Sequence, residues 1–544
     1  MTTPHPVEIE LKLTLPPQQA AAFLKRMARR RTLKGTSSAP LQQDLVTRYF
    51  DTPDFALSAE GVALRVRRVG RRWLQTLKTE GERQGGLSRR AEFEMPVSRG
   101  APDWNRFPAE ALARVPESLR AQLAPVFETR FHRTAWLIGG KGGAQIEVAL
   151  DVGAVIAGER SQPICEVELE LKSGQPDALF ALALEWAAAF DCLPFDISKA
   201  ERGVRLAHGI EAEPVKSASL LLDDGMSVEA GFAAIVQACL AQFQANLPGA
   251  LASDDIEYVH QARVALRRLR AALRLARKAC ALPPGLLDGL RTLAAALGPA
   301  RDWDVLCGET LPAIAPHFPD TGAWQRGMEA LQARRAQVRA AMREAIAGAR
   351  PGAWLLAMQR WLLQHGWRLS AEGDLSPSAE AVPEAQRFVQ LSPLDAWSRR
   401  VLQTGHRRIV RGAENFAKLA PRERHALRIA IKRQRYAAEF FQTLYQSRSK
   451  RCKRRQARYL ALLRDAQDSL GRANDAHIAT GLLTAAHTTP HGLRNAVDRS
   501  LTGLAETGPM GPFVLGWLAA RQAEAANGES ARLMRAFPKL KCYW

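Results

Sequence analysis

Residues 7–12 read Val-Glu-Ile-Glu-Leu-Lys, a strict alternation of apolar and charged side chains. In a β-strand successive side chains point to opposite faces, so Glu8, Glu10 and Lys12 would share one face and the apolar residues the other. Such a charged face fits two structures: a plain solvated surface, or the lining of a cavity that holds divalent metal and phosphate. The later strands decide between them.

Most of the N-terminal third repeats this alternation. Short runs of period two, separated by turn residues, carry Arg, Lys, Glu or Asp on one face at residues 48–52, 64–67, 73–78, 90–94, 131–138, 145–151 and 166–172. A helix is predicted over residues 16–34. The polar faces are almost purely charged, whereas a solvated sheet face normally mixes in Thr, Ser and Gln. We therefore predict an eight-stranded antiparallel β-barrel whose charged interior holds a small ligand.

Length, charge and cysteine content limit the protein class. A chain of 544 residues is too long for one core, and its net charge of +21 favours an anionic partner. The 7 cysteines include no CxxC pair, which argues against disulfides and a zinc site and fits a reducing compartment. The sequence shows no signal segment and no apolar run of about 18 residues. We predict a soluble, cytoplasmic protein.

The ordered set of charged residues resembles the CYTH superfamily of triphosphate tunnel metalloenzymes, named for class IV adenylate cyclases and thiamine triphosphatases. The resemblance spans residues 5–206 and includes Ser-Lys-Ala-Glu-Arg at 198–202. It implies that Glu8 and Glu10, with Glu168 and Glu170 opposite, bind Mg²⁺ or Mn²⁺. It also implies that a set of cations clamps the triphosphate: Lys12, Arg65, Arg67, Lys78, Arg133 and Lys199.

Further acidic residues belong to the same implied site. Asp151 joins Glu8, Glu10 and Lys12 as a catalytic residue, and Glu94 would complete the acidic lining. Two choices stay open. Glu166, Glu168 and Glu170 share one face, so any two of them can be the ligands. Either Arg130 or Arg133 faces inward.

The reaction expected of such a site is hydrolysis of the terminal phosphate from tripolyphosphate, in which positioning and charge neutralisation do most of the catalysis. No Ser-His-Asp or Cys-His set with recognisable spacing occurs. Two alternative functions stay open. In the first, the same barrel acts on an organic triphosphate, as a thiamine triphosphatase or an adenylate cyclase. In the second, the protein binds polyphosphate granules without catalysis, although the intact charged set argues against this.

After a linker at residues 208–218, the period becomes helical over residues 219–544, which we predict to be a separate all-α domain. It contains an internal repeat, at about residues 225–380 and 390–540. His-Gln-Ala-Arg-Val-Ala-Leu-Arg at 260–267 recurs as His-Ala-Leu-Arg-Ile-Ala-Ile-Lys at 425–432. Leu-Gly-Pro-Ala-Arg-Asp at 297–302 recurs as Leu-Gly-Arg-Ala-Asn-Asp at 470–475. Two pseudo-twofold-related helical bundles are predicted.

Each copy places its basic residues on one helix face. An arc of about 80° holds His260, Arg263, Arg267, Arg270 and Arg274, and the second copy repeats it with His425, Arg428, Lys432 and Arg435. Stacked like charges repel one another and almost no Glu lies between them, so we interpret these faces as a polyanion groove rather than a solvated surface. The two histidines either add charge at mildly acidic pH or are structural.

This region, from about residue 225 to the 480s, resembles the CHAD domain, a conserved histidine α-helical domain that binds inorganic polyphosphate and is often fused to CYTH. The resemblance implies long-chain polyphosphate as a partner and polyphosphate granules as a location. Specific nucleic-acid binding is not expected, because the basic faces carry few base-reading or stacking side chains. Membrane binding is not expected either, since Trp354, Trp361 and Trp367 are spaced like core residues.

Overall fold

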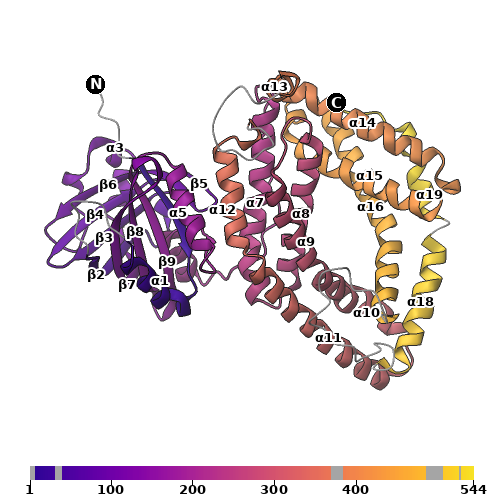
Figure 1. Cartoon of the computed structure of the whole chain (residues 1–544), viewed down its shortest axis with the longest axis horizontal. Coiled ribbons are helices and arrows are strands. Elements are labelled where there is room, and N and C mark those ends of the chain that lie inside the picture. Colours follow the sequence, from indigo (N-terminus) through magenta and orange to yellow (C-terminus); the bar gives the residue numbers. More distant parts are fainter. Residues whose placement is uncertain (1–6, 31–38, 369–383, 485–506, 526–527) are drawn as a thin grey trace. The chain divides into compact units, whose positions relative to one another are not determined.

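The computed structural model describes residues 7–30, 39–368, 384–484, 507–525 and 528–544 (Figure 1). The chain divides into two compact units, one formed by residues 1–213 with 350–365 and the other by residues 214–349 with 366–544. None of the described helices has both the length and the hydropathy that a membrane span requires.

The first unit is built on a closed antiparallel barrel, which confirms the predicted fold. Its strands pair in the order β1-β9-β8-β7-β2-β3-β4-β6, and β6 pairs with β1 to close the ring. Their bounds are β1 Val7–Thr14, β2 Leu41–Asp51, β3 Ala63–Val69, β4 Arg72–Lys78, β6 Leu87–Val97, β7 Ala124–Gly139, β8 Gln145–Ala157 and β9 Arg160–Ser173. The short strands β5 (Glu82–Gln84) and β10 (Leu193–Pro194) pair with β6 and β1. The helix predicted over residues 16–34 is shorter, α1 (Ala20–Ala28), and residues 31–34 lie outside the described residues.

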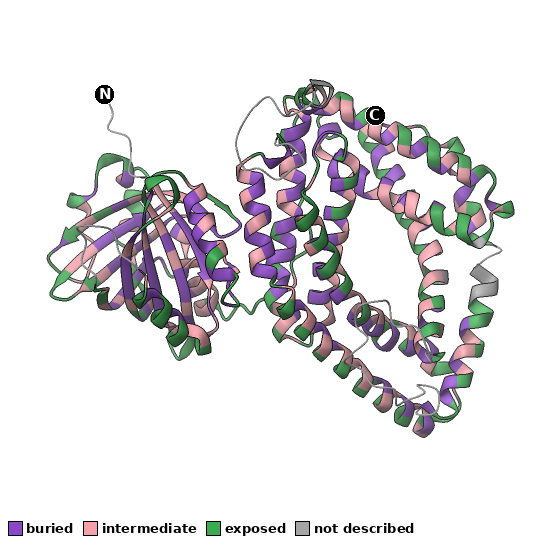
Figure 2. Cartoon of the chain, viewed as in Figure 1, coloured by how far each residue is buried: buried purple, intermediate pink, exposed green. Residues whose placement is uncertain are grey.

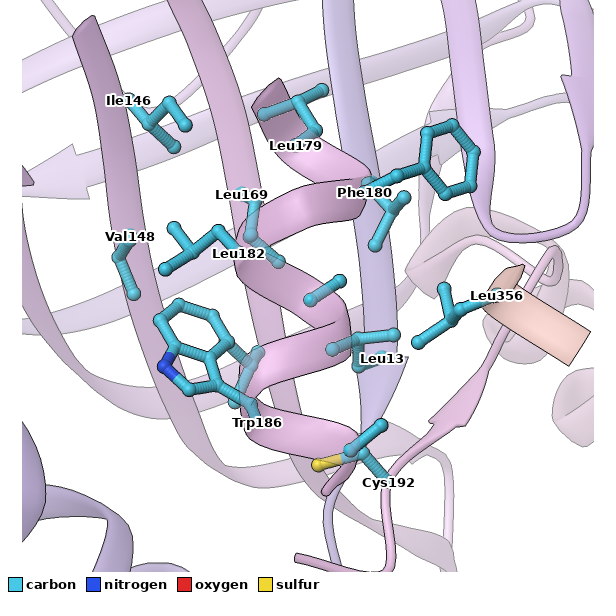
Figure 3. Packing of buried hydrophobic residues seen from close by; sticks show 14 of the residues in the cluster. Leu13, Ile146, Val148, Leu169, Leu179, Phe180, Leu182, Trp186, Cys192 and Leu356 are labelled. Carbon is cyan, nitrogen blue, oxygen red and sulfur yellow. The ribbon is translucent and has the colours of Figure 1, made fainter. Parts of the chain in front are cut away.

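Strand register places charged side chains on the inner face. Lys12 lies opposite Glu168 and Arg133 opposite Asp151, whereas Glu10 lies opposite Glu170, so neighbouring strands place both opposite and like charges side by side. The intervening residues point outward and are covered by helices. Figure 3 shows Leu13, Val148 and Leu169 against Leu182 and Trp186 of α5 (Asp177–Ala187). The barrel is therefore charged inside and apolar outside, as the alternation of its strands predicts.

An apolar cluster of barrel residues packs against one helix. Tyr49 and Phe127 stack with ring centroids 4.6 Å apart in a cluster that packs against α6 (Lys199–His208). Gly203 allows this close packing, because a Cβ at this position would lie 2.0 Å from the Phe127 ring. The N-terminus of α6, capped by Ser198, thereby brings Lys199 into the barrel.

A helix from the second half of the sequence completes the first unit. Helix α12 (Pro351–Leu363) packs on α5 and β10, and its Leu356 is fully buried in the cluster of Figure 3. Arg360 donates two hydrogen bonds to the Asp177 carboxylate, at 2.6 and 2.7 Å. These residues lie in the stretch that the sequence assigns to the helical domain, yet residues 350–365 belong to the barrel unit.

The second unit is helical, and its two halves pack in the same order. In the first half α7 (Val228–Ala252) contacts α8 (Ile256–Ala276), α8 contacts α9 (Pro284–Val305), and α9 contacts α11 (Thr321–Gly348). The second half repeats this with α14 (Leu394–Glu414), α15 (Pro421–Phe440), α16 (Lys450–Thr484) and α18 (Met510–Ala525). Figure 2 shows α7 and α8 buried along most of their length, whereas α11 and α16 are largely exposed or half-buried.

The two halves meet through equivalent elements. Ser227 and Pro393, the N-caps of α7 and α14, form an isolated antiparallel bridge. The helices that carry the two basic faces, α8 and α15, contact each other, and so do α9 and α16. Pairing of an element with its own counterpart is the geometry that a twofold axis produces. We infer that the repeat in the sequence is arranged about a pseudo-twofold axis.

Candidate active site

Three carboxylates lie together at the centre of the barrel. One oxygen each from Asp151, Glu166 and Glu168 lies within 4.8 Å of the others. Lys199 donates to all three, at 2.7 Å to Asp151 and 2.9 Å to Glu168. Arg133 donates two 2.7 Å hydrogen bonds to Asp151 and one of 2.5 Å to Glu168. The carboxylates thus lie close enough together to bind a metal ion, and in this structure they are hydrogen-bonded to Lys199 and Arg133.

Charge pairing sets the protonation of this cluster. Burial raises the pKa of Asp151, but Lys199 and Arg133 outweigh it and hold that pKa below its usual value. Burial likewise raises the pKa of Glu168, and Lys199, Lys12 and Arg133 bring it well below its usual value. Burial lowers the pKa of Lys12, but Glu166 and Glu168 raise it overall. These groups are therefore ionised at neutral pH.

The carboxylates of β1 form a second acidic group. Lys78 donates to Glu8 at 2.7 Å, and Arg90 bridges the two strand carboxylates, at 3.3 Å to Glu8 and 2.9 Å to Glu10. Glu92 also pairs with Lys78, at 3.0 Å. One set of cations therefore holds β1, and another holds the β8–β9 cluster.

Two further arginines line the cavity, and one of them stands apart from these ion pairs. Among the described residues, Arg67 has no carboxylate within ion-pair distance, and its Nε donates to the Thr47 hydroxyl at 3.1 Å. Burial and the neighbouring Arg65 and Arg133 lower the pKa of Arg67 to about 10. Arg65 pairs with Glu92 at 3.3 Å, but its buried Nε has no hydrogen-bond partner. The cavity thus presents the buried charge of Arg67, which no carboxylate pairs in the described part of the chain, and an unused donor on Arg65.

The structure brings most of the predicted residues to one cavity. Its lining includes every predicted substrate-binding cation and the four predicted metal ligands: Glu8, Glu10, Lys12, Arg65, Arg67, Lys78, Arg133, Glu168, Glu170 and Lys199. Asp151 lies behind this surface, fully buried, with Glu166. Glu170 lies farther toward solvent, bonded to Lys172 at 2.7 Å, and burial raises its pKa.

The structure differs from the sequence-based prediction at Glu94 and Arg90, and it decides between Arg130 and Arg133. Glu94 is exposed, accepts a hydrogen bond from Thr76 and is not in the lining. Arg133 points inward, whereas Arg130 is exposed and pairs with Glu128 at 2.5 Å. Arg90 was missed as a site residue: it shares a strand face with Glu92 and Glu94, but the pairing of β6 with β1 is what places it beside Glu8 and Glu10.

The second unit brings the predicted basic residues of both repeats together. Burial and four neighbouring arginines, Arg267, Arg428, Arg263 and Arg435, lower the pKa of Lys432 to about 7. The buried Nε atoms of Arg267 and Arg428 have no hydrogen-bond partner. Cations from α8 and α15 therefore face one another. We call the surface formed by Arg263, Arg267, Arg428, Lys432 and Arg435 the basic groove.

Other members of the predicted basic faces differ in their surroundings. Burial and Arg301 lower the pKa of the half-buried His260, so it is neutral at neutral pH, whereas His425 is exposed. Arg270 is exposed, and Arg274 lies at a different cavity described below. The second echo of the repeat also reaches the groove, because Arg428 donates to Asn474 at 3.0 Å.

Comparison with known families matches each unit separately. The family model of the CYTH domain matches residues 7–204, and that of the CHAD domain matches residues 234–484. The chain contains a CYTH domain followed by a CHAD domain. The CYTH match covers the barrel and α6, and the CHAD match includes both basic helices and the basic groove.

Individual proteins cover the chain in part. An inorganic triphosphatase of Haemophilus influenzae is 36% identical over 204 residues, which are 37% of this chain and 54% of that protein. An uncharacterized protein of Mycobacterium tuberculosis is 30% identical over 301 residues, 52% of this chain and 56% of that protein. The chain thus matches about half the length of these relatives. The crystal structure of the CHAD domain from Ricinus communis is 29% identical, with 61% of this chain and 98% of that chain covered and a TM-score of 0.47.

Proposed function

We propose that the CYTH barrel is a metal-dependent inorganic triphosphatase that hydrolyses tripolyphosphate to pyrophosphate and phosphate. The observation that carries this proposal is the buried charge of Arg67, which no carboxylate within ion-pair distance compensates among the described residues, beside the free Nε donor of Arg65 and carboxylates in the same cavity. Forked guanidinium groups bind phosphate oxygens with two parallel hydrogen bonds. The 36% identity of the barrel region to an inorganic triphosphatase supports the same reaction.

The composition of the cavity favours an inorganic substrate. Apart from charged residues, its lining consists of Tyr49, Ser198 and three alanines, Ala63, Ala149 and Ala200. Tyr49 is already stacked on Phe127. A nucleotide base or a thiazole ring needs an apolar or aromatic wall, and this cavity supplies none beyond that tyrosine. The organic-triphosphate alternative is therefore the less favoured candidate.

The residues present fit a hard divalent cation. Asp151, Glu166 and Glu168 offer closely spaced carboxylate oxygens, the ligand type that Mg²⁺ and Mn²⁺ prefer, and Glu8 and Glu10 offer more. Such an ion, when bound, neutralises phosphate charge and makes water a better nucleophile. Lys12, Arg133 and Lys199 orient the carboxylates, while Arg65 and Arg67 hold the phosphate chain and stabilise the charge that develops on the leaving pyrophosphate.

Metal removal tests this proposal. We expect the full-length protein to release phosphate from tripolyphosphate with Mg²⁺ or Mn²⁺, and to lose at least about 100-fold in rate in excess EDTA. ATP and thiamine triphosphate are assayed in the same way as tripolyphosphate. Glu10→Ala, which removes one carboxylate of the proposed metal site, is assayed beside the wild type. Equal or faster turnover of either organic triphosphate would reassign the substrate. If all three were inert with metal present, the barrel would be a binding site without catalysis.

We propose further that the basic groove of the CHAD domain binds long-chain polyphosphate, either to hold it near the barrel or to place the protein at polyphosphate granules. The support is its cluster of like charges from two helices, which an anionic chain would relieve. Because a phosphate chain has no bases to recognise, the scarcity of stacking aromatics on these faces is no obstacle.

Binding at the groove is expected to depend on pH through Lys432. Its pKa of about 7 in the free protein means that bound anion must raise that pKa and draw in a proton. Polyphosphate affinity should therefore fall as the pH rises from about 6 to about 9, at constant ionic strength, by up to about tenfold per pH unit.

Lys432→Arg is the control for this effect, because an arginine at this position stays charged over the whole range. We expect it to keep polyphosphate affinity and to lose most of the pH dependence, as measured by titration of the full chain. A pH profile identical to that of the wild type would show that another group titrates.

A further inference from the structure

The helical unit contains a second basic cavity, which lies outside the basic groove. It has a volume of about 800 Å³ and lies between the C-terminal end of α8 and helices α14 and α15. Its cations come from all three elements: Arg274, Arg277, Lys278, Arg400, Arg408 and Arg433. No Asp or Glu lines the cavity, and in the described ranges none of the six has a carboxylate within ion-pair distance.

The internal repeat allows this cavity to be compared with the equivalent position on the other side of the pseudo-twofold axis. With His425 aligned on His260, Arg433 corresponds to Arg268 and Glu439 corresponds to Arg274. Arg268 of α8 donates to Glu439 of α15 at 3.1 Å and lies over the Phe440 ring at 5.0 Å. The counterpart of this ion pair is Arg433 of α15 with Arg274 of α8. Where one side of the pseudo-twofold has an attractive pair, the other has two like charges.

Three of the six cations have a local explanation, but the whole set does not. Arg274 lies in the last turn of α8 and Arg277 and Lys278 directly follow it, where cations are favourable beside free carbonyl groups. That account does not extend to Arg400 and Arg408 of α14 or to Arg433 of α15. Arg274 and Arg433 line the same cavity without a carboxylate partner in the described ranges, and an anion between them would accept charge-assisted hydrogen bonds from both.

One wall of the cavity is apolar. Trp397, Val401 and Leu275 contribute to it, with Val389 and Ala437 nearby. The Trp397 side chain is half-buried and lines the cavity, and its ring makes an edge-on contact with Phe441 at a centroid distance of 5.6 Å. An inorganic phosphate chain would use the cations and leave this wall in water. A ligand with both phosphates and a flat ring would use both.

We propose that this cavity is a nucleotide-binding site, separate from the triphosphatase barrel and from the basic groove. The phosphates bind between Arg274 and Arg433, with Arg400 and Arg408 within the same cationic rim, and the base packs against Trp397. The volume of the cavity falls within the range typical of small-ligand pockets, about 300–1,000 Å³.

Binding of ADP to the full-length protein, measured calorimetrically in EDTA, tests the proposal. Arg274→Glu rebuilds at this position the ion pair that Arg268 makes with Glu439, so it should preserve or raise the melting temperature. The same variant should weaken ADP binding by about tenfold or more. Unchanged ADP affinity in Arg274→Glu overturns the site.

Trp397→Ala tests the ring-binding wall independently. It should weaken ADP by about tenfold and leave the affinity for pyrophosphate within about twofold. If Trp397→Ala leaves ADP affinity unchanged while Arg274→Glu weakens ADP and pyrophosphate alike, the ligand is an inorganic anion and the nucleotide proposal fails. Arg65→Ala in the barrel and Arg428→Ala in the groove are the location controls. Loss of ADP binding in either one would place the nucleotide at that site instead.

Discussion

Replacement of Glu168 by Gln is expected to lower tripolyphosphate hydrolysis by about two to three orders of magnitude. Glu168 is the carboxylate on which Lys12, Arg133 and Lys199 converge, at 3.3, 2.5 and 2.9 Å. Gln keeps the size of the side chain but removes the negative charge that binds a cation and orients three substrate-binding groups. The expected change is mainly in kcat, together with a higher metal concentration for half-maximal rate, measured by phosphate release.

Glu94→Gln is the matched control for this experiment. The substitution is the same, on a barrel strand, but Glu94 is exposed and outside the cavity lining. We expect activity within about twofold of the wild type. A loss at Glu94 as large as that at Glu168 would mean that the charge of the barrel as a whole, and not the β8–β9 cluster, sets the rate.

Leu356→Ala is expected to destabilise the barrel, although this residue lies in the sequence of the helical half. Leu356 is fully buried among residues of β1, α5 and the segment before β10. Its truncation should cost about 3 kcal/mol, from lost apolar burial and the cavity left behind. For a unit of this size that cost corresponds to a drop of roughly 6–12 °C in the midpoint of thermal inactivation.

Leu41→Ala provides the comparison, since Leu41 is on β2 of the same unit with 59% of its surface exposed. It should change the midpoint by less than about 2 °C. If Leu356→Ala shifted the midpoint no more than Leu41→Ala does, α12 would not be part of the barrel core. An activity loss at temperatures where the Leu356→Ala variant is still folded would indicate that α12 also positions the site. Helix α12 packs on β10, and β10 leads to Phe195, whose amide donates to the Lys12 carbonyl at 3.0 Å.

The barrel could be predicted because its signal is local. An alternation of period two, with one face purely charged, indicates both the strands and the face that lines the cavity, and Lys12 and Arg65 follow from it, whereas Lys199, on α6, is predicted only through the family resemblance. Arg90 and Glu94 show the limit of such reasoning. They share a strand face, but only the pairing of β6 with β1 shows that Arg90 reaches Glu8 and Glu10 while Glu94 lies outside the lining.

Long-range features had no such local signal. Helix α12 has the apolar content of any buried helix, and nothing in its own sequence states that Arg360 pairs with Asp177, which is 183 residues away. The like charges of Arg274 and Arg433 are also invisible residue by residue. They stand out only when the two repeats are aligned and the structure shows that their counterparts form an ion pair.

Because residues 350–365 belong to the barrel unit, the chain passes between the two units three times, after residues 213, 349 and 365. The two units are therefore not consecutive segments of the chain joined by a single linker. A protease that nicks the linker at 208–218 leaves both fragments joined through α12, so a nicked sample would keep its hydrodynamic size until it was denatured. Anyone who exchanges or isolates the barrel must take a piece from the middle of the helical half with it, and during synthesis the barrel core stays incomplete until most of the first helical repeat has been made.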